Sequence, residues 1–148
     1  MSVVSASTKL DAPAYLVWET LQKTELLLYV MRPLLTVRGS FPTKSWRDAG
    51  VVKIERLVLF GIVPLWGHEI RVVRLDDEKR EAMTRERGGP ITKWEHSIKV
   101  EPLSETSCRY TDEIKIEAGN LTPFVRLFAG IFYRHRRSRW RALARVLA

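Results

Sequence analysis

The chain has 148 residues, of which 25 are Lys or Arg and 17 are Asp or Glu, so its formal net charge is +8. This length is enough for one hydrophobic core without metals or disulfides but short for two ordinary domains, so we expect a single domain over residues 1–148. Cys108 is the only cysteine, which excludes an internal disulfide, and no apolar run approaches the roughly 20 residues needed to span a bilayer. The amino terminus lacks a basic segment leading into an apolar stretch, so we expect a cytoplasmic protein without a secretion signal.

The first part of the chain predicts one strand and two short helices. Alternation in residues 4–10 predicts a strand. A helix follows at once, because Asp11 can cap it and Pro13 suits a first turn. A second short helix is predicted for residues 24–31, and Pro33 ends it.

The remaining chain predicts about six strands and one long helix. Strand-like stretches, separated by turn-rich pieces, lie at 34–38, 51–60, 65–75, 80–87, 91–102 and 108–118. An amphipathic helix is predicted from residue 122 to about 147. We find no repeat and no linker. This order suggests a sheet wrapped around a helix, an arrangement that readily encloses an apolar cavity.

The last two predicted strands have one charged face and one mostly apolar face, on which His96 and Asp112 are the polar exceptions. A turn centred on Ser104 would place like charges opposite each other, whereas a turn centred on Glu105 places opposite charges together. The favourable pairs are Lys93 with Glu117, Glu95 with Lys115 and Glu101 with Arg109. We prefer this second register, which puts Asp112 diagonal to His96 at a backbone separation of about 7 Å.

The long predicted helix carries much of the excess positive charge on one side. Its apolar residues recur at intervals of three and four. They are Leu121, Phe124, Val125, Phe128, Ile131, Phe132, Ala142, Leu143 and Val146. The opposite side carries Arg126, Arg134, Arg137, Arg141 and Arg145. We favour a solvated outer face, with a surface for nucleic acid or an anionic membrane as the alternative.

Three segments resemble a known group. The run from Gly89 to His96, followed by Thr111 and Asp112 and then by the long helix, resembles the START-like polyketide cyclase/dehydrase group of the SRPBCC superfamily. Residues 10–18 and 59–68 resemble that superfamily's first strand and helix and its middle strands. The resemblance covers nearly the whole chain.

The resemblance implies an α+β helix-grip fold. In this fold an antiparallel sheet of about seven strands wraps around the C-terminal helix, with two short helices after the first strand and a ligand cavity inside. Members of the superfamily bind lipids, hormones, polyketides and other apolar molecules, and only some catalyse reactions. The fold alone therefore leaves the function open.

His96 and Asp112 are the first candidates for a functional site. The pair can orient a ligand carbonyl or hydroxyl, or it can supply a general acid or base and its orienting carboxylate for a cyclisation or dehydration. The structural alternative, which we favour over catalysis, is a buried hydrogen-bonded pair that fixes the strand register.

Arg56 and His135 are further candidates. Arg56 shares a predicted strand face with apolar residues, and its guanidinium can clamp a carboxylate or phosphate of the ligand; alternatively it pairs with Glu69 or Glu86 or reaches water. His135 lies on the apolar side of the predicted helix, at the cavity or its rim, and His68 poses the same question. These scattered histidines lack metal-ligand spacing, and no cofactor-binding motif is present, so we expect neither a metal nor a cofactor.

Aromatic side chains can form the cavity wall or simply fill the core. The candidates are Trp66, Trp94, Tyr110, Phe124, Phe128 and Phe132. The apolar loop at residues 61–64 is a candidate lid or membrane-touching tip, with an ordinary hairpin turn as the alternative.

Three classes of function remain open. We rank a carrier or sensor of an apolar small molecule first, ahead of a cyclase or dehydratase that uses His96. The third class is a basic interaction module that binds RNA, a ribosome or an anionic membrane through the last helix. The sequence gives no indication of the oligomeric state.

Overall fold

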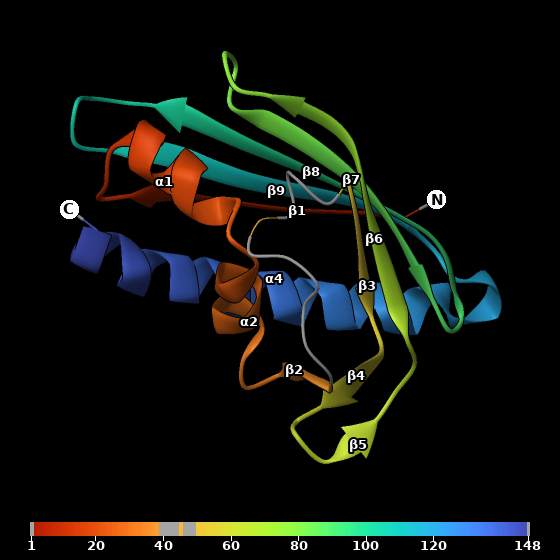
Figure 1. Ribbon diagram of the computed structural model, residues 1–148. Coiled ribbons are helices and arrows are strands. Elements are labelled where there is room, and N and C mark those ends of the chain that lie inside the picture. The colour runs from red at the N-terminus through yellow and green to blue at the C-terminus, as the bar shows by residue number, and fades with distance from the viewer. Residues whose placement is uncertain (1, 39–44, 46–49, 148) are drawn as a thin grey trace.

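The computed structural model describes residues 2–38, 45 and 50–147. It has the predicted α+β helix-grip fold, in which a curved antiparallel sheet wraps around a long C-terminal helix (Figure 1). The elements are β1 (Ser2–Leu10), α1 (Ala14–Leu21), α2 (Thr24–Met31), β2 (Leu35–Arg38), β3 (Val51–Ile54), β4 (Arg56–Leu59), β5 (Val63–Pro64), β6 (His68–Asp76), β7 (Glu81–Gly88), β8 (Ile91–Pro102), β9 (Cys108–Glu117), the 3-10 turn η1 (Gly119–Leu121) and α4 (Thr122–Leu147).

The strands form two antiparallel sheets. The larger has the order β1-β9-β8-β7-β6-β3, and the smaller has the order β2-β4-β5. Between β8 and β9 the predicted register is confirmed, since Glu95 lies opposite Lys115 and Asp112 lies opposite Ile98. Complementary charges on the outer face thus fix which inner-face residues meet, as cross-strand pairing predicts.

The two short helices occur where the sequence predicts them, but their caps differ. The residue at the N-cap of α1 is Pro13, which makes no side-chain cap, so the capping role predicted for Asp11 is wrong. Asp11 lies two residues before that position, too early for its carboxylate to meet the first free N–H groups. In α2 the N-cap residue is Lys23, which also makes no side-chain cap, and Thr24 is the first helical residue. Both helices direct apolar faces inward, and α2 contacts α4.

The stretch predicted as one strand over residues 51–60 is divided between the two sheets. β3 ends at Ile54, the chain bends at Glu55, and β4 pairs with β2 and β5 instead. The bend resets the alternation, so Leu57 faces the interior while Arg56 is exposed. Arg56 therefore does not share the inward face with Val52 and Ile54, and its exposure matches the alternative in which it reaches water.

The last helix has the predicted bounds, but its buried face is rotated from the predicted one. The residues buried on α4 are Ala129, Phe132, Tyr133, Arg136, Trp140 and Ala144. Leu121, Phe124, Ile131 and Val146, which were predicted to face inward, are exposed. Two large aromatic rings determine the orientation, because Trp140 packs on Tyr110 and Tyr133 packs on His96.

Candidate functional site

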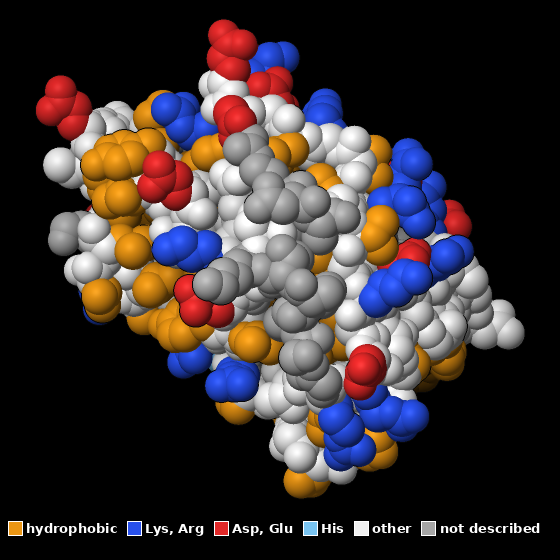
Figure 2. Space-filling model, in the orientation of Figure 1, with side chains coloured by type: hydrophobic (Ala, Val, Ile, Leu, Met, Phe, Trp, Pro, Cys, Tyr) orange, Lys and Arg blue, Asp and Glu red, His pale blue; other side chains and the backbone are white. Residues whose placement is uncertain are grey.

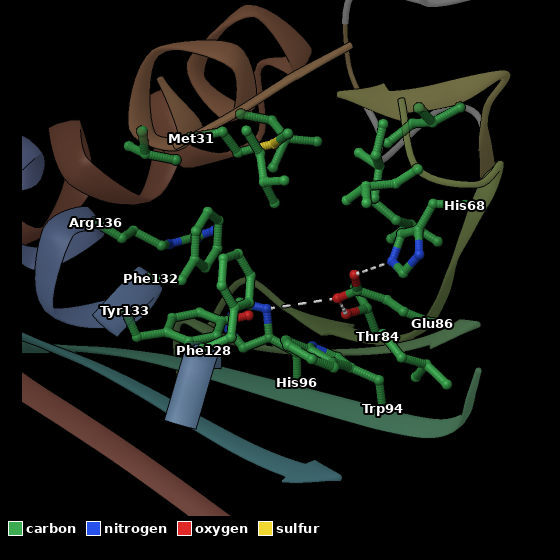
Figure 3. Close-up of a pocket in the computed structure, with 18 of the residues that line it drawn as sticks. Met31, His68, Thr84, Glu86, Trp94, His96, Phe128, Phe132, Tyr133 and Arg136 are labelled. Carbon is green, nitrogen blue, oxygen red and sulfur yellow. Dashed lines mark hydrogen bonds and ion pairs between the residues drawn. The ribbon is translucent and has the colours of Figure 1, made fainter. Parts of the chain in front are cut away.

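A cavity of about 380 Å³ lies between the concave face of the sheet, α2 and α4 (Figure 3). Hydrocarbon and aromatic side chains form most of its wall. They come from α2 (Leu26, Val30, Met31), from β3 and β4 (Val52, Ile54, Leu57) and from α4 (Val125, Phe128, Phe132). The volume lies within the range of cavities that hold small organic ligands.

One wall of the cavity is polar. Thr84 and Glu86 are two residues apart on β7 and so point to the same side of the sheet. The carboxylate of Glu86 lies 2.9 Å from Nε2 of His68 on β6 and accepts a 3.1 Å hydrogen bond from the Thr84 hydroxyl. Nδ1 of His96, on β8, lies 3.7 Å from the same carboxylate. Figure 3 shows this group across the cavity from Arg136.

The polar wall continues into the core as a chain of paired groups. Nε2 of His96 lies 2.6 Å from Oδ1 of Asp112, which also accepts a 3.0 Å hydrogen bond from the Tyr110 hydroxyl. Arg136 donates to that hydroxyl at 2.9 Å, and its Nε lies 3.4 Å from Oδ2 of Asp112. Strands β7, β8 and β9 and helix α4 thus supply alternating acidic and basic groups.

The charges in this chain stabilise one another. Burial alone would raise the pKa of Glu86, but interactions with His68 and His96 hold it well below the usual range. Burial of His96 favours its neutral form, yet the charge of Asp112 and contacts with Asp112 and Glu86 raise its pKa. Burial would also raise the pKa of Asp112, but the charge of Arg136 and then of His96 lowers it. Each carboxylate therefore lies against basic groups, Glu86 against His68 and His96 and Asp112 against His96 and Arg136.

The surroundings of His96 bear on its chemistry. Nε2 lies 2.6 Å from Oδ1 of Asp112, within hydrogen-bond distance, and Nδ1 lies 3.7 Å from the Glu86 carboxylate, an ion-pair contact beyond hydrogen-bond distance. An imidazole flanked by two carboxylates is suited to donate a hydrogen bond or a proton.

Most of the predicted site residues reach the cavity. Those that line it are Trp66, Trp94, His96, Phe124, Phe128 and Phe132. Tyr110 and Asp112 are buried behind His96 instead, outside the lining. His135 is also outside the lining, and its Nε2 lies 2.5 Å from the carbonyl oxygen of Arg32. Arg56, being exposed, does not contact the cavity.

Sequence reasoning missed Glu86, Thr84, Tyr133 and Arg136. Alternation along β7 places Thr84 and Glu86 on one face with the buried Ala82, which is a usable signal. Arg136 falls four residues from both Phe132 and Trp140, a spacing that puts it on their side of the helix. Because we interpreted the arginines of this helix as a solvated outer face, the inward position of Arg136 was not recognised.

Two glycines, Gly88 and Gly89, lie against Trp66, which lines the cavity. A Cβ added at Gly88 or Gly89 would overlap the Trp66 side chain, and Gly89 has a φ of +53°. Only glycine tolerates this backbone without strain while leaving room for the ring. The pair therefore allows the Trp66 indole to lie against the turn between β7 and β8.

Within the described part of the chain, no group of three or more His, Cys, Asp or Glu side chains is arranged to hold a metal ion. None of the described helices is both long and apolar enough to cross a membrane.

Comparison with known proteins gives a family and a fold. Residues 8–146 match the family described as a domain of unknown function (DUF8410). No curated protein matches the chain. Several solved structures share the fold at low identity. A START superfamily protein from Mycobacterium smegmatis is 15% identical, with a TM-score of 0.71 and 99% of each chain covered.

Two further solved structures are similar over nearly their whole length. A protein from Chromobacterium violaceum has a TM-score of 0.76 at 13% identity, with 97% of this chain and 98% of that chain covered. The Zhui aromatase/cyclase from a Streptomyces species has a TM-score of 0.61 at 16% identity, with 97% of this chain and 93% of that chain covered. These similarities show that the chain shares the fold of a START superfamily protein and of an aromatase/cyclase.

Proposed function

The chain belongs to the family described as a domain of unknown function (DUF8410), and we propose that it binds a neutral, largely apolar small molecule between the sheet and α4. The observation that carries this proposal is the cavity of about 380 Å³ with hydrocarbon walls and one polar wall. Such a combination gives affinity through apolar burial and orientation through a few fixed polar groups. Similarity to a START superfamily protein and to an aromatase/cyclase supports the same class of ligand.

The charge balance of the site favours a neutral ligand. Both carboxylates of the polar groups already have basic partners, since Glu86 lies against His68 and His96, and Asp112 lies against His96 and Arg136. A charged ligand would bring an additional buried charge without a partner, which is strongly unfavourable. A hydroxyl or carbonyl group instead can exchange hydrogen bonds with Thr84 or His96 at the polar wall.

A fluorescent probe tests the proposal. N-phenyl-1-naphthylamine is neutral and apolar, and we expect it to bind with enhanced fluorescence. Ile70→Trp should fill the cavity and weaken probe binding at least about tenfold, because Ile70 lines it. Val73→Trp is the matched control on the same strand, since Val73 is 43% exposed. Equal probe binding by a folded Ile70→Trp variant and the wild type would refute the proposal.

Competition between two ligands tests the ligand class. Dodecanol and dodecanoate have the same alkyl chain and differ in the charge of the head group. We expect dodecanol to displace the probe at concentrations about tenfold lower, because dodecanoate must bury an unpaired charge. Stronger displacement by dodecanoate would refute the neutral class while leaving the apolar cavity intact.

A cyclase- or dehydratase-type enzyme is the second candidate, favoured by His96 in the cavity wall. In this case the imidazolium would donate a proton to the leaving hydroxyl, and the Glu86 carboxylate in the same wall would take the proton from the carbon next to the carbonyl. The C–O and C–H bonds break, a C=C bond forms and water is released. We expect His96→Asn to abolish water loss from a β-hydroxyketone substrate, followed by mass spectrometry, while substrate binding persists. Asp112→Asn should act in the same direction by removing the partner of His96. A carrier would retain binding in both variants and show no turnover in the wild type.

A further inference from the structure

Apolar side chains are exposed where the cavity reaches the surface. Of the described residues that line the cavity, only Leu121 and Phe124 are exposed, at 46% and 70%. Leu121 ends η1 and Phe124 lies in the first turn of α4, so this end of the helix borders the mouth. Leu59 and Leu65, on either side of the β4–β5 turn, line the same cavity and are half-buried.

The β4–β5 turn adds a second exposed apolar segment. Phe60 is 58% exposed, Ile62 is 80% exposed and Val63 is 44% exposed. Backbone hydrogen bonds from Phe60 to Leu34 and from Ile62 to Leu59 fix the shape of the turn. Exposed large apolar side chains mark interaction surfaces. The turn and the segment around the start of α4 (Leu121 and Phe124) are separate segments that border the same cavity, and together we call them the rim (Figure 1).

Arginines flank both parts of the rim. Residues 56–67 include Arg56 and no Asp or Glu, and the exposed Glu55 precedes them. On α4, Arg126 lies two residues after Phe124, whereas the other six arginines lie at residue 134 or beyond and Arg136 is buried. In the smaller sheet Arg56 pairs with Arg38, and both are exposed. Figure 2 shows Lys and Arg side chains beside hydrophobic ones at the lower end of the molecule, where Figure 1 places β4 and β5.

We propose that the rim docks on the surface of an anionic lipid bilayer. Apolar side chains that enter the interface, next to arginines at the level of the lipid phosphates, are the features that such binding requires. A second copy of the chain fits less well, because two basic rims would repel each other. RNA is the main alternative, because Phe60 and Phe124 offer stacking surfaces, whereas the aliphatic side chains Ile62, Val63 and Leu121 favour the lipid interface.

Docking in this orientation would place the cavity mouth against the membrane. An apolar ligand could then pass between the bilayer and the cavity without crossing water. This role in ligand exchange rests on the proposed function, whereas the docking itself does not. The two are separable by experiment.

Vesicle co-sedimentation tests the docking. We expect the protein to bind vesicles of phosphatidylcholine and phosphatidylglycerol, to bind phosphatidylcholine alone at least about tenfold more weakly, and to be released by salt. Ile62→Asp and Phe124→Asp should each lower partitioning at least about tenfold. Val146→Asp is the matched control, because Val146 is 79% exposed near the other end of α4; it should leave partitioning unchanged.

The outcomes separate the alternatives. Absence of vesicle binding, or an equal loss in Val146→Asp, would overturn the docking proposal. The proposal would also be overturned if Ile62→Asp bound vesicles like the wild type and poly(U) RNA displaced the protein from them completely. That result would indicate a general cationic surface. Ile62 does not line the cavity, so its variant should still bind N-phenyl-1-naphthylamine in solution. Vesicle binding without any probe binding would instead refute the proposed function and leave the docking intact.

Discussion

Arg136 brings a full charge into the interior, where it contacts Tyr110 and Asp112. Removing one member of a buried ion pair leaves the other uncompensated, at a cost of about 3–5 kcal/mol. We therefore expect Arg136→Met to lower the free energy of unfolding by about 3 kcal/mol, measured by urea denaturation. Arg134→Met is the control, since Arg134 is exposed on the same helix and should change stability by less than about 0.5 kcal/mol. Equal losses in the two variants would contradict the pairing.

The buried titratable groups predict a pH window of maximal stability. Glu86 and Asp112 have lowered pKa values, so their contribution is present above the ordinary carboxyl pKa of about 4 and is lost as the pH falls through their folded values. His96 has a raised pKa, so its contribution is present below about 6.5 and is lost as the pH rises through its folded value. We expect urea denaturation to show greatest stability between these limits.

The variant His96→Gln tests whether His96 causes the loss of stability at higher pH. Glutamine cannot carry the charge of the imidazolium, so the fall in stability above about pH 6.5 should become shallower. Unfolding free energies at several pH values in this range provide the measurement. If the unfolding free energy of His96→Gln fell with pH as steeply as that of the wild type, another group would cause the loss of stability at higher pH.

At the scale of elements, the turn between β7 and β8 controls one side of the cavity. Gly89→Ala places a methyl group where the Trp66 ring lies, so we expect the ring to move and the N-phenyl-1-naphthylamine affinity to fall several-fold. Gly119→Ala is the control, because Gly119 also has a positive φ, of +56°, but has open space around it. Both variants incur backbone strain, and only Gly89→Ala should affect the probe. Loss of binding in both would point to general destabilisation.

The elements also show where sequence patterns suffice. The β8–β9 register follows from charged pairs such as Glu95 with Lys115, because these residues are neighbours in one hairpin and pair on its exposed face. The division of residues 51–60 does not follow, because β3 and β4 are both apolar and the bend at Glu55 depends on partners elsewhere in the chain. The rotation of α4 likewise depends on contacts of Tyr133 and Trp140 with distant strands.

At the scale of the whole molecule, the sequence predicts only those parts of the site that lie close together in the chain. His96 and Asp112 were identifiable as polar exceptions on an apolar face of one hairpin. Glu86 and Arg136 join them from β7 and α4, and only the closed fold brings their side chains together. The sheet curves around a single helix, and the space that the side chains between them leave unfilled is the cavity, so its walls come from elements far apart in the chain.

This unfilled interior predicts that ligand binding stabilises the whole domain. A ligand that binds only the folded state, at a free concentration of 100 times its Kd, adds about 2.7 kcal/mol to the free energy of unfolding. We expect dodecanol to produce this gain in urea denaturation, with an increase that follows the logarithm of its concentration. Ile70→Trp occupies the same space with a side chain and should gain little from dodecanol, whereas Val73→Trp should respond like the wild type. A wild type that unfolds at the same urea concentration with and without dodecanol would mean that the cavity does not take up this ligand.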